Sequence, residues 1–160
     1  MTGTSMDGID ISLVETNGLD LKRKNINHFH KYNNKTKKFL LSILDEDINF
    51  SLERKEFIDD IVTIEHYKAL KKFDVLKKTD FVGFHGQTIY HNPDKKISIQ
   101  LGNPQKLAKM LNRNVVSDFR NKDIQIGGHG APLAPIYHQF MINNLNLKLP
   151  SCILNIGGVA

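Results

Sequence analysis

The chain has 160 residues, of which 40% are hydrophobic, and it carries a formal net charge of +5 at pH 7. This length and composition suffice for one ordinary domain with a hydrophobic core. Only four of the 22 basic residues are arginines, and lysine is the poorer residue for bidentate contacts with bases and phosphates. No apolar run reaches the length of a membrane span, and the first residues do not resemble a secretory signal. We therefore expect a cytoplasmic protein that has neither nucleic acid nor membrane among its partners.

The first feature along the chain is a loop with glycines near both ends, Gly3-Thr4-Ser5-Met6-Asp7-Gly8-Ile9-Asp10. Glycine lets backbone N–H groups approach an oxyanion closely, the hydroxyl groups add donors, and Asp7 is suited to orient a hydrated magnesium ion. No lysine follows the second glycine and a strand follows the loop, so the segment differs from a nucleotide-binding P-loop. A phosphate-holding loop and a plain hairpin turn are equally compatible with these residues.

Hydrophobic periodicity and turn signals predict alternating strands and helices along the rest of the chain. An antiparallel meander is expected over residues 9–30. Helices are predicted over residues 37–44, 52–73, 104–111 and 132–144. Strands are predicted over residues 80–84, 97–101, 115–116 and 151–155. Because polar and glycine-rich clusters follow the strand ends, a ligand site is expected there, as in open α/β sheets.

Two of these predicted elements carry expectations about burial. In the helix over residues 52–73, three- and four-residue spacing predicts one buried face, formed by Phe57, Ile61, Ile64, Tyr67 and Leu70. The single cysteine, Cys152, excludes an intramolecular disulfide, and we expect it to be a small buried residue of the last strand.

Polar clusters follow two of the central strands. The segment His85-Gly86-Gln87-Thr88 is suited to hydrogen bonding a hydroxyl-rich ligand, or to holding its own loop together. Its spacing to His91 matches no zinc motif, so no metal site is expected. In the segment 117–120, the guanidinium of Arg120 is suited to a carboxylate or phosphate, and a structural ion pair with Asp118 is the equal alternative.

Two glycine-rich segments lie in the last third of the chain. The loop over residues 127–132, which includes Gly130 and Ala131, leads into a helix and offers free N–H groups, or is simply a flexible turn. The segment Asn155-Ile156-Gly157-Gly158 follows a predicted strand, as a second phosphate-holding turn would.

Taken in order, these motifs resemble those of the anhydro-N-acetylmuramic acid kinase family. The matching segments are Gly3–Asp10, Phe84–Thr88 with His91 and Pro93, Gln100–Pro104, Val116–Arg120, Gly127–Pro135 with His138, and Asn155–Ala160. The family is similar to the superfamily of sugar kinases, heat-shock ATPases and actin. The resemblance therefore implies an α/β fold: a truncated actin-like ATPase (ribonuclease H-like) lobe, in which helices cover a mixed sheet.

The resemblance also implies an activity and a set of ligands. The family uses ATP and water to open the 1,6-anhydro ring of anhydro-N-acetylmuramic acid and to phosphorylate O6, which gives N-acetylmuramic acid 6-phosphate in peptidoglycan recycling. ATP and magnesium are the implied cofactors. The implied cofactor-binding residues are Gly3, Thr4, Ser5, Met6, Asp7, Gly8, Ile9, Asp10, Gly157 and Gly158. The implied sugar-binding residues are His85, Gln87, Thr88, Arg120, Gly130 and Ala131.

The sequence departs from the family pattern at both ends. Only Met1 and Thr2 precede the first loop, where the family has a strand, and the family's catalytic carboxylate lies in an Asp-Thr-Gly-Pro motif beyond residue 160. We therefore assign no catalytic residue here and expect this chain alone to be inactive. Residues 1–150 are expected to form the N-terminal lobe with the ATP and sugar loops, and residues 151–160 the first strand of a second lobe that is otherwise absent. The expected partners are a second copy when the protein is complete, or a complementary C-terminal chain; the alternative is an inactive remnant or a non-catalytic binding lobe.

Overall fold

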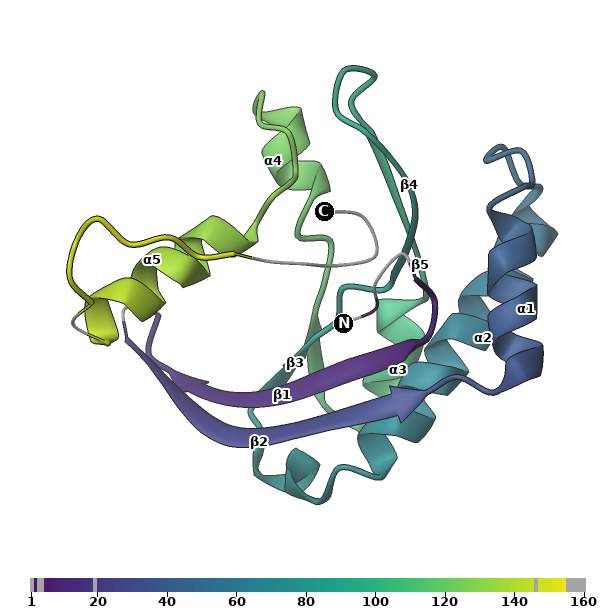
Figure 1. The fold of residues 1–160 in the computed structure, drawn as a ribbon. Coiled ribbons are helices and arrows are strands. Elements are labelled where there is room, and N and C mark those ends of the chain that lie inside the picture. Colours follow the sequence, from purple (N-terminus) through teal and green to yellow (C-terminus); the bar gives the residue numbers. More distant parts are fainter. Residues whose placement is uncertain (1, 3–4, 19, 146, 155–160) are drawn as a thin grey trace.

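The computed structural model describes residues 2, 5–18, 20–145 and 147–154 (Figure 1). Strands and helices alternate after an N-terminal hairpin, as the hydrophobic pattern predicts. The strands are β1 (Gly8–Thr16), β2 (Leu21–Lys31), β3 (Phe81–Gly83), β4 (Gln87–Asn92), β5 (Ile97–Leu101) and β6 (Asn114–Val116). The helices are α1 (Asn34–Ile43), α2 (Leu52–Lys71), the 3₁₀ helix η1 (Asp74–Lys78), α3 (Pro104–Leu111), α4 (Asn121–Gln125) and α5 (Ala134–Asn144).

The described strands form three separate two-stranded sheets and not one mixed sheet. Strands β1 and β2 pair antiparallel with a register shift between Ser12 and Val14, β4 and β5 pair antiparallel, and β3 and β6 pair in parallel. The expected α/β class is confirmed, with the described strands divided among three small sheets, and the segment after β1 forms one further strand of the expected antiparallel meander. Strand β2 is one continuous partner for β1, so the hairpin has no third strand among the described residues.

Helix α2 is the centre of the hydrophobic core. It lies behind the hairpin, between α1 on one side and α3 on the other (Figure 1). The larger core cluster joins the open end of the hairpin, where β1 begins and β2 ends, to α1, α2 and β5, through Met6, Ile9, Tyr32, Leu40, Ile43, Ile58, Val62, Ala69 and Leu101. A smaller cluster of Leu70, Phe84 and Leu107 joins α2 to the end of β3 and to α3. Helix α2 thus packs against the start of the hairpin, the end of β3 and the end of β5, which lead to or from predicted site loops.

The buried face of α2 differs from the one that the hydrophobic spacing predicts. Phe57 is 54% exposed and Ile64 is exposed as well, whereas Ile58 and Val62 are fully buried. Two hydrogen bonds of polar side chains explain this difference. Asp59 Oδ1 accepts a hydrogen bond from the Gly102 N–H at 2.7 Å. The neighbouring Thr63 Oγ1 accepts one from the backbone of residue 103 at 2.8 Å. These contacts turn a partly polar face inward, which a purely hydrophobic criterion cannot identify.

The ends of several elements also differ from the sequence expectations. Helix α1 begins at Asn34, because the Asn33 side chain caps it by accepting from the Thr36 N–H. Helix α4 was not predicted. Residues 151–154 adopt no strand conformation and are exposed, Cys152 included, so the buried-strand prediction was wrong for these residues. Asn155 lies outside the described residues.

No helix in the described part of the chain combines the length and the apolar character needed to cross a bilayer.

Candidate functional site

The N-terminal loop leads directly into β1. The structure describes it from Ser5 onward, and Gly3 and Thr4 lie outside the described residues. The Ser5 hydroxyl donates to Asp7 Oδ1 at 2.8 Å. This hydrogen bond lowers the pKa of the exposed Asp7 carboxyl below its ordinary value, with a smaller contribution from the charge of Lys37. At neutral pH the loop therefore presents an ionised carboxylate beside a hydroxyl group.

The shape of this loop depends on two residues. Met6 has a positive φ of 48° and a fully buried side chain, which anchors the loop in the core. A Cβ on Gly8 would lie 2.5 Å from the carbonyl oxygen of His30 and 2.6 Å from the Phe29 ring, so only glycine fits where β1 meets β2. Strand β1 is joined to β2 between Thr16 and Leu21, so this loop lies at the opposite end of β1 from that connection.

The residue just before the N-terminal loop contacts the loop after β3. The Thr2 hydroxyl donates to the carbonyl oxygen of Gly86 at 2.8 Å, and the contact is buried. Gly86 has a φ of +73°, and a Cβ there would lie 2.5 Å from the Leu101 carbonyl oxygen, so this loop also sits tightly against β5. The structure therefore brings the residue that precedes the first motif into direct contact with a motif 84 residues further along the chain.

The polar side chains after Gly86 hold their own hairpin. Gln87 is fully buried, and its Nε2 donates to the Thr88 carbonyl oxygen at 3.2 Å. The Thr88 hydroxyl accepts from Gln100 Nε2 at 3.3 Å, and the same nitrogen lies 2.8 Å from Ser98 Oγ. Neither Gln87 nor Thr88 lines the cavity described below. The structure thus favours a loop-holding role for these two, and their assignment to the sugar remains a prediction.

Arg120 lies against His85, just before α4. Its Nε donates to His85 Nε2 at 3.0 Å, and its Nη1 donates to the carbonyl oxygen of Gly130 at 2.7 Å. Burial lowers the pKa of His85, an effect that the Gly86 carbonyl opposes and the charge of Arg120 reinforces. Burial also lowers the pKa of Arg120. Three residues from separate motifs, His85, Arg120 and Gly130, therefore form one cluster.

Asp118 is not the partner of Arg120 among the ion pairs of the described residues. It has a positive φ of 63°, and its Oδ1 accepts from Asn121 Nδ2 at 2.6 Å. The alternative of a structural Asp118–Arg120 pair is thus not supported, and the guanidinium is held by a neutral imidazole and a carbonyl group.

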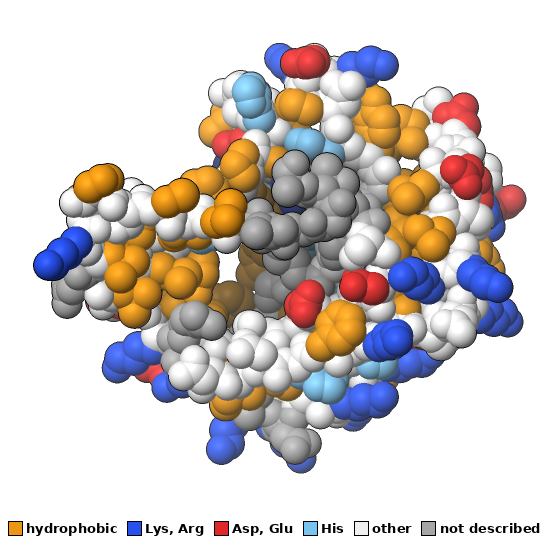
Figure 2. All heavy atoms as spheres, in the orientation of Figure 1, with side chains coloured by type: hydrophobic (Ala, Val, Ile, Leu, Met, Phe, Trp, Pro, Cys, Tyr) orange, Lys and Arg blue, Asp and Glu red, His pale blue; other side chains and the backbone are white. Residues whose placement is uncertain are grey.

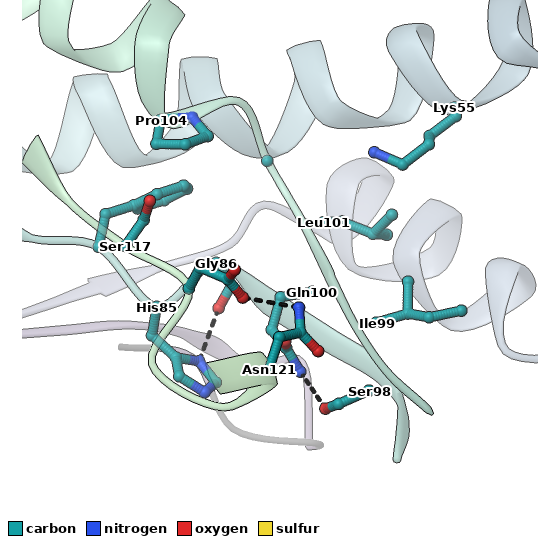
Figure 3. A pocket seen from close by; sticks show the side chains of 13 residues that line it. Lys55, His85, Gly86, Ser98, Ile99, Gln100, Leu101, Pro104, Ser117 and Asn121 are labelled. Carbon is teal, nitrogen blue, oxygen red and sulfur yellow. Dashed lines mark hydrogen bonds between the residues drawn. The ribbon is translucent and has the colours of Figure 1, made fainter. Parts of the chain in front are cut away.

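A cavity of about 330 Å³ opens beside this cluster (Figure 3). One wall comes from the loops after β3 and β6, with His85, Gly86, Ser117, Asp118 and Asn121, and the other comes from β5 and the turn that follows it. Lys55 reaches the cavity from α2, where its Nζ also contacts Asp59 Oδ2 at 2.5 Å. Sequence reasoning missed Lys55, since a charged residue at a helix surface carries no signal for a distant cavity.

The remaining predicted residues lie outside this cluster or outside the described residues. Ile9 is buried in the core and Asp10 is exposed on β1, so neither side chain lines the cavity. Ala131 follows Gly130 and is half-buried outside the cavity lining. Gly157 and Gly158 lie outside the described residues. Within the described ranges, no group of three or more His, Cys, Asp or Glu side chains gathers as a metal site would.

Loops at strand ends that surround a cavity in a mixed α/β fold form the arrangement in which α/β proteins commonly bind small molecules. The profile of the anhydro-N-acetylmuramic acid kinase family matches residues 1–160. The chain therefore belongs to the anhydro-N-acetylmuramic acid kinase family, and its mixed α/β architecture is consistent with part of an actin-like ATPase lobe.

Curated relatives carry the same description. The anhydro-N-acetylmuramic acid kinase of Pelagibacter ubique is 38% identical over 169 residues, that of Bradyrhizobium diazoefficiens 34% over 172, and that of Zymomonas mobilis 38% over 175. Each comparison covers the whole of this chain. The chain spans 44%, 46% and 47% of these relatives, which is less than half of their length.

Proposed function

We propose that this chain is the N-terminal part of a cytoplasmic, ATP-dependent kinase. The complete enzyme opens the 1,6-anhydro ring of anhydro-N-acetylmuramic acid and phosphorylates O6, which gives N-acetylmuramic acid 6-phosphate for peptidoglycan recycling. One observation carries the proposal beyond family membership: Thr2, the residue just before the proposed nucleotide loop, donates a hydrogen bond to Gly86, which belongs to the loop that carries His85 and lines the cavity. A kinase needs such proximity, because phosphoryl transfer depends on positioning the phosphate donor against the acceptor.

The described residues fit the proposed ligands. Ser5 and Asp7 present exposed oxygen atoms at the N-terminal loop, and an ionised carboxylate is the group that magnesium prefers as a direct or water-mediated ligand. Bound magnesium would neutralise charge on the ATP phosphates. The Arg120 guanidinium suits the carboxylate of a muramic acid, because its planar fork of donors matches two carboxylate oxygens. His85 and Gly130 hold that guanidinium in place.

Catalysis by the complete enzyme also requires a base that activates water, and we assign that role to the part of the kinase that this chain does not span. The 160-residue chain alone should therefore show no turnover with ATP, magnesium and the anhydro sugar. Co-expression with the complementary C-terminal half of a relative should restore turnover. Substitution of Gly8 by valine should then abolish it. Turnover by the isolated chain would refute the assignment of the base.

The surface of α5 supports a partner for this chain. No residue of α5 is buried, and Ile136 is 80% exposed. Figure 2 shows hydrophobic side chains gathered at this end of the molecule. We propose that the complementary half of the kinase covers this surface and that the completed protein is a homodimer. Sedimentation of the chain with and without the co-expressed half measures both steps.

A non-catalytic sugar-binding lobe is the second candidate, because the chain spans less than half of its relatives. Calorimetric titration with anhydro-N-acetylmuramic acid separates the two. Binding without turnover, even in the presence of a complementary half, favours the binding lobe.

A further inference from the structure

Asp123 connects two glycine residues of the loop that precedes α5. Its carboxylate Oδ2 accepts a hydrogen bond from the Gly130 N–H at 2.7 Å, and its backbone carbonyl accepts one from the Gly128 N–H at 2.8 Å. Asp123 lies on α4 and no family motif in the sequence points to it. Asp123 thus accepts hydrogen bonds from two backbone N–H groups of this loop.

The carbonyl side of Gly130 is held as well. Its oxygen accepts from Arg120 Nη1 at 2.7 Å, so Gly130 bridges the Asp123 carboxylate and the Arg120 guanidinium. A Cβ on Gly130 would lie 2.8 Å from two side-chain atoms of the buried Ile124 and 3.1 Å from the Arg120 carbonyl oxygen. Gly130 therefore has little freedom to move away from Arg120.

The second hydrogen-bond partner of Arg120 is His85, and only one tautomer of His85 satisfies both of its contacts. His85 Nδ1 lies 3.0 Å from the Gly86 carbonyl oxygen, which can only accept, so Nδ1 carries the proton. His85 Nε2 is then a free acceptor for the Arg120 Nε–H at 3.0 Å. A protonated His85 would set an N–H group and a positive charge against the guanidinium.

We propose that Asp123 is a positioning residue that, through Gly130, fixes the Arg120 guanidinium against neutral His85. The complete enzyme then binds its acidic sugar with a guanidinium that is already in place. This role rests on the proposed function only for the identity of the sugar. The contacts that lead from Asp123 to His85 are present in the structure without any ligand.

The first test is nuclear magnetic resonance of the ¹⁵N-labelled 160-residue chain. The wild-type protein should show His85 as the Nδ1–H tautomer, with a scalar coupling between Arg120 Nε and His85 Nε2. Asp123→Ala should weaken that coupling at least twofold and raise the pKa of His85, because the guanidinium is released. The charge of His85 also affects the pKa of His66 on α2, so the titration of His66 is followed in the same spectra.

Two variants serve as controls. Asp123→Asn keeps an oxygen that accepts from Gly130 and should retain the wild-type tautomer and coupling. Asp94→Ala removes an exposed carboxylate from the β4–β5 turn and should change neither. If Asp123→Ala leaves the pKa and the coupling of His85 unchanged, or if the wild-type His85 carries its proton on Nε2, the proposal is overturned. If Asp123→Ala does not fold, the wild-type measurement still tests the contact between neutral His85 and Arg120 on which the proposal depends, and its absence overturns the proposal.

The second test uses the completed kinase and anhydro-N-acetylmuramic acid. Asp123→Ala should raise KM for the sugar about tenfold while KM for ATP stays within twofold, and Asp123→Asn should recover most of the loss. An equal change in both KM values would indicate a general structural defect and overturn the positioning role. If the wild-type protein neither binds nor converts this sugar, the proposed function fails, whereas the resonance measurements still decide the role of Asp123.

Discussion

The buried histidine of α2 should make the stability of this protein depend on pH. His66 Nδ1 donates to the Val62 carbonyl oxygen at 2.8 Å, its ring packs edge-on against Phe84, and its Nε2 has no partner within the described residues. Burial lowers the pKa of His66 from 6.5 to about 4, although the Val62 carbonyl opposes this change. Between these values the unfolded chain binds a proton that the folded chain does not. The free energy of unfolding therefore decreases as the pH falls, by about 2 kcal/mol at pH 5 and about 3 kcal/mol at pH 4.

Urea unfolding between pH 7 and pH 4 measures this contribution. Other groups titrate in the same range, so the informative quantity is the difference between wild type and His66→Leu, which retains an apolar side chain of similar size. This difference should shift by about 3 kcal/mol in favour of the variant between pH 7 and pH 4. The exposed His129 provides the control, and His129→Asn should follow the wild-type profile. Parallel profiles for wild type and His66→Leu would refute the reasoning.

Three further predictions concern the loops and their supports. Gly8→Val forces methyl groups into the neighbouring strand and should destabilise the fold by about 3 kcal/mol, which thermal melts will measure; an unchanged melting temperature contradicts it. Asp59→Ala leaves the Gly102 N–H without its acceptor and should cost about 2 kcal/mol in urea unfolding, whereas Asp60→Ala, which breaks an exposed ion pair, should cost less than about 1 kcal/mol. Arg120→Ala in the completed kinase should weaken sugar binding by about 1.5–3 kcal/mol in calorimetry, and unchanged affinity would remove this residue from the site.

Elements with local signals could be predicted from the sequence. Helix α3 has its predicted bounds, because the Asn103 side chain caps it and Pro104 stands in its first turn. Strand β5 also has its predicted bounds, since alternation defines a half-buried strand. These signals depend on neighbouring residues alone, so they need no knowledge of the tertiary structure.

Features that depend on distant partners could not be predicted. The inward face of α2 is set by Asp59 and Thr63, whose partners lie about 40 residues further along the chain. The motif analysis identified His85, Arg120 and Gly130 but not the contacts that unite them, because hydrogen bonds between loops leave no periodicity. Asp123 escaped notice for the same reason, and its five-residue helix is too short for a hydrophobic pattern.

The lack of any buried residue in α5 has a consequence for the hydrogen exchange of its amides. An isolated helix of 11 residues is marginal in water, and most helices in proteins owe their persistence to one buried face. Helix α5 has residues that are at most half-buried in the described structure, whereas α2 buries eight of its residues. The amides of α5 should therefore exchange through local opening at almost no free-energy cost, and those of α2 only through opening of the core. A partner that covers α5 would reveal itself by slowing exchange over residues 134–144 alone.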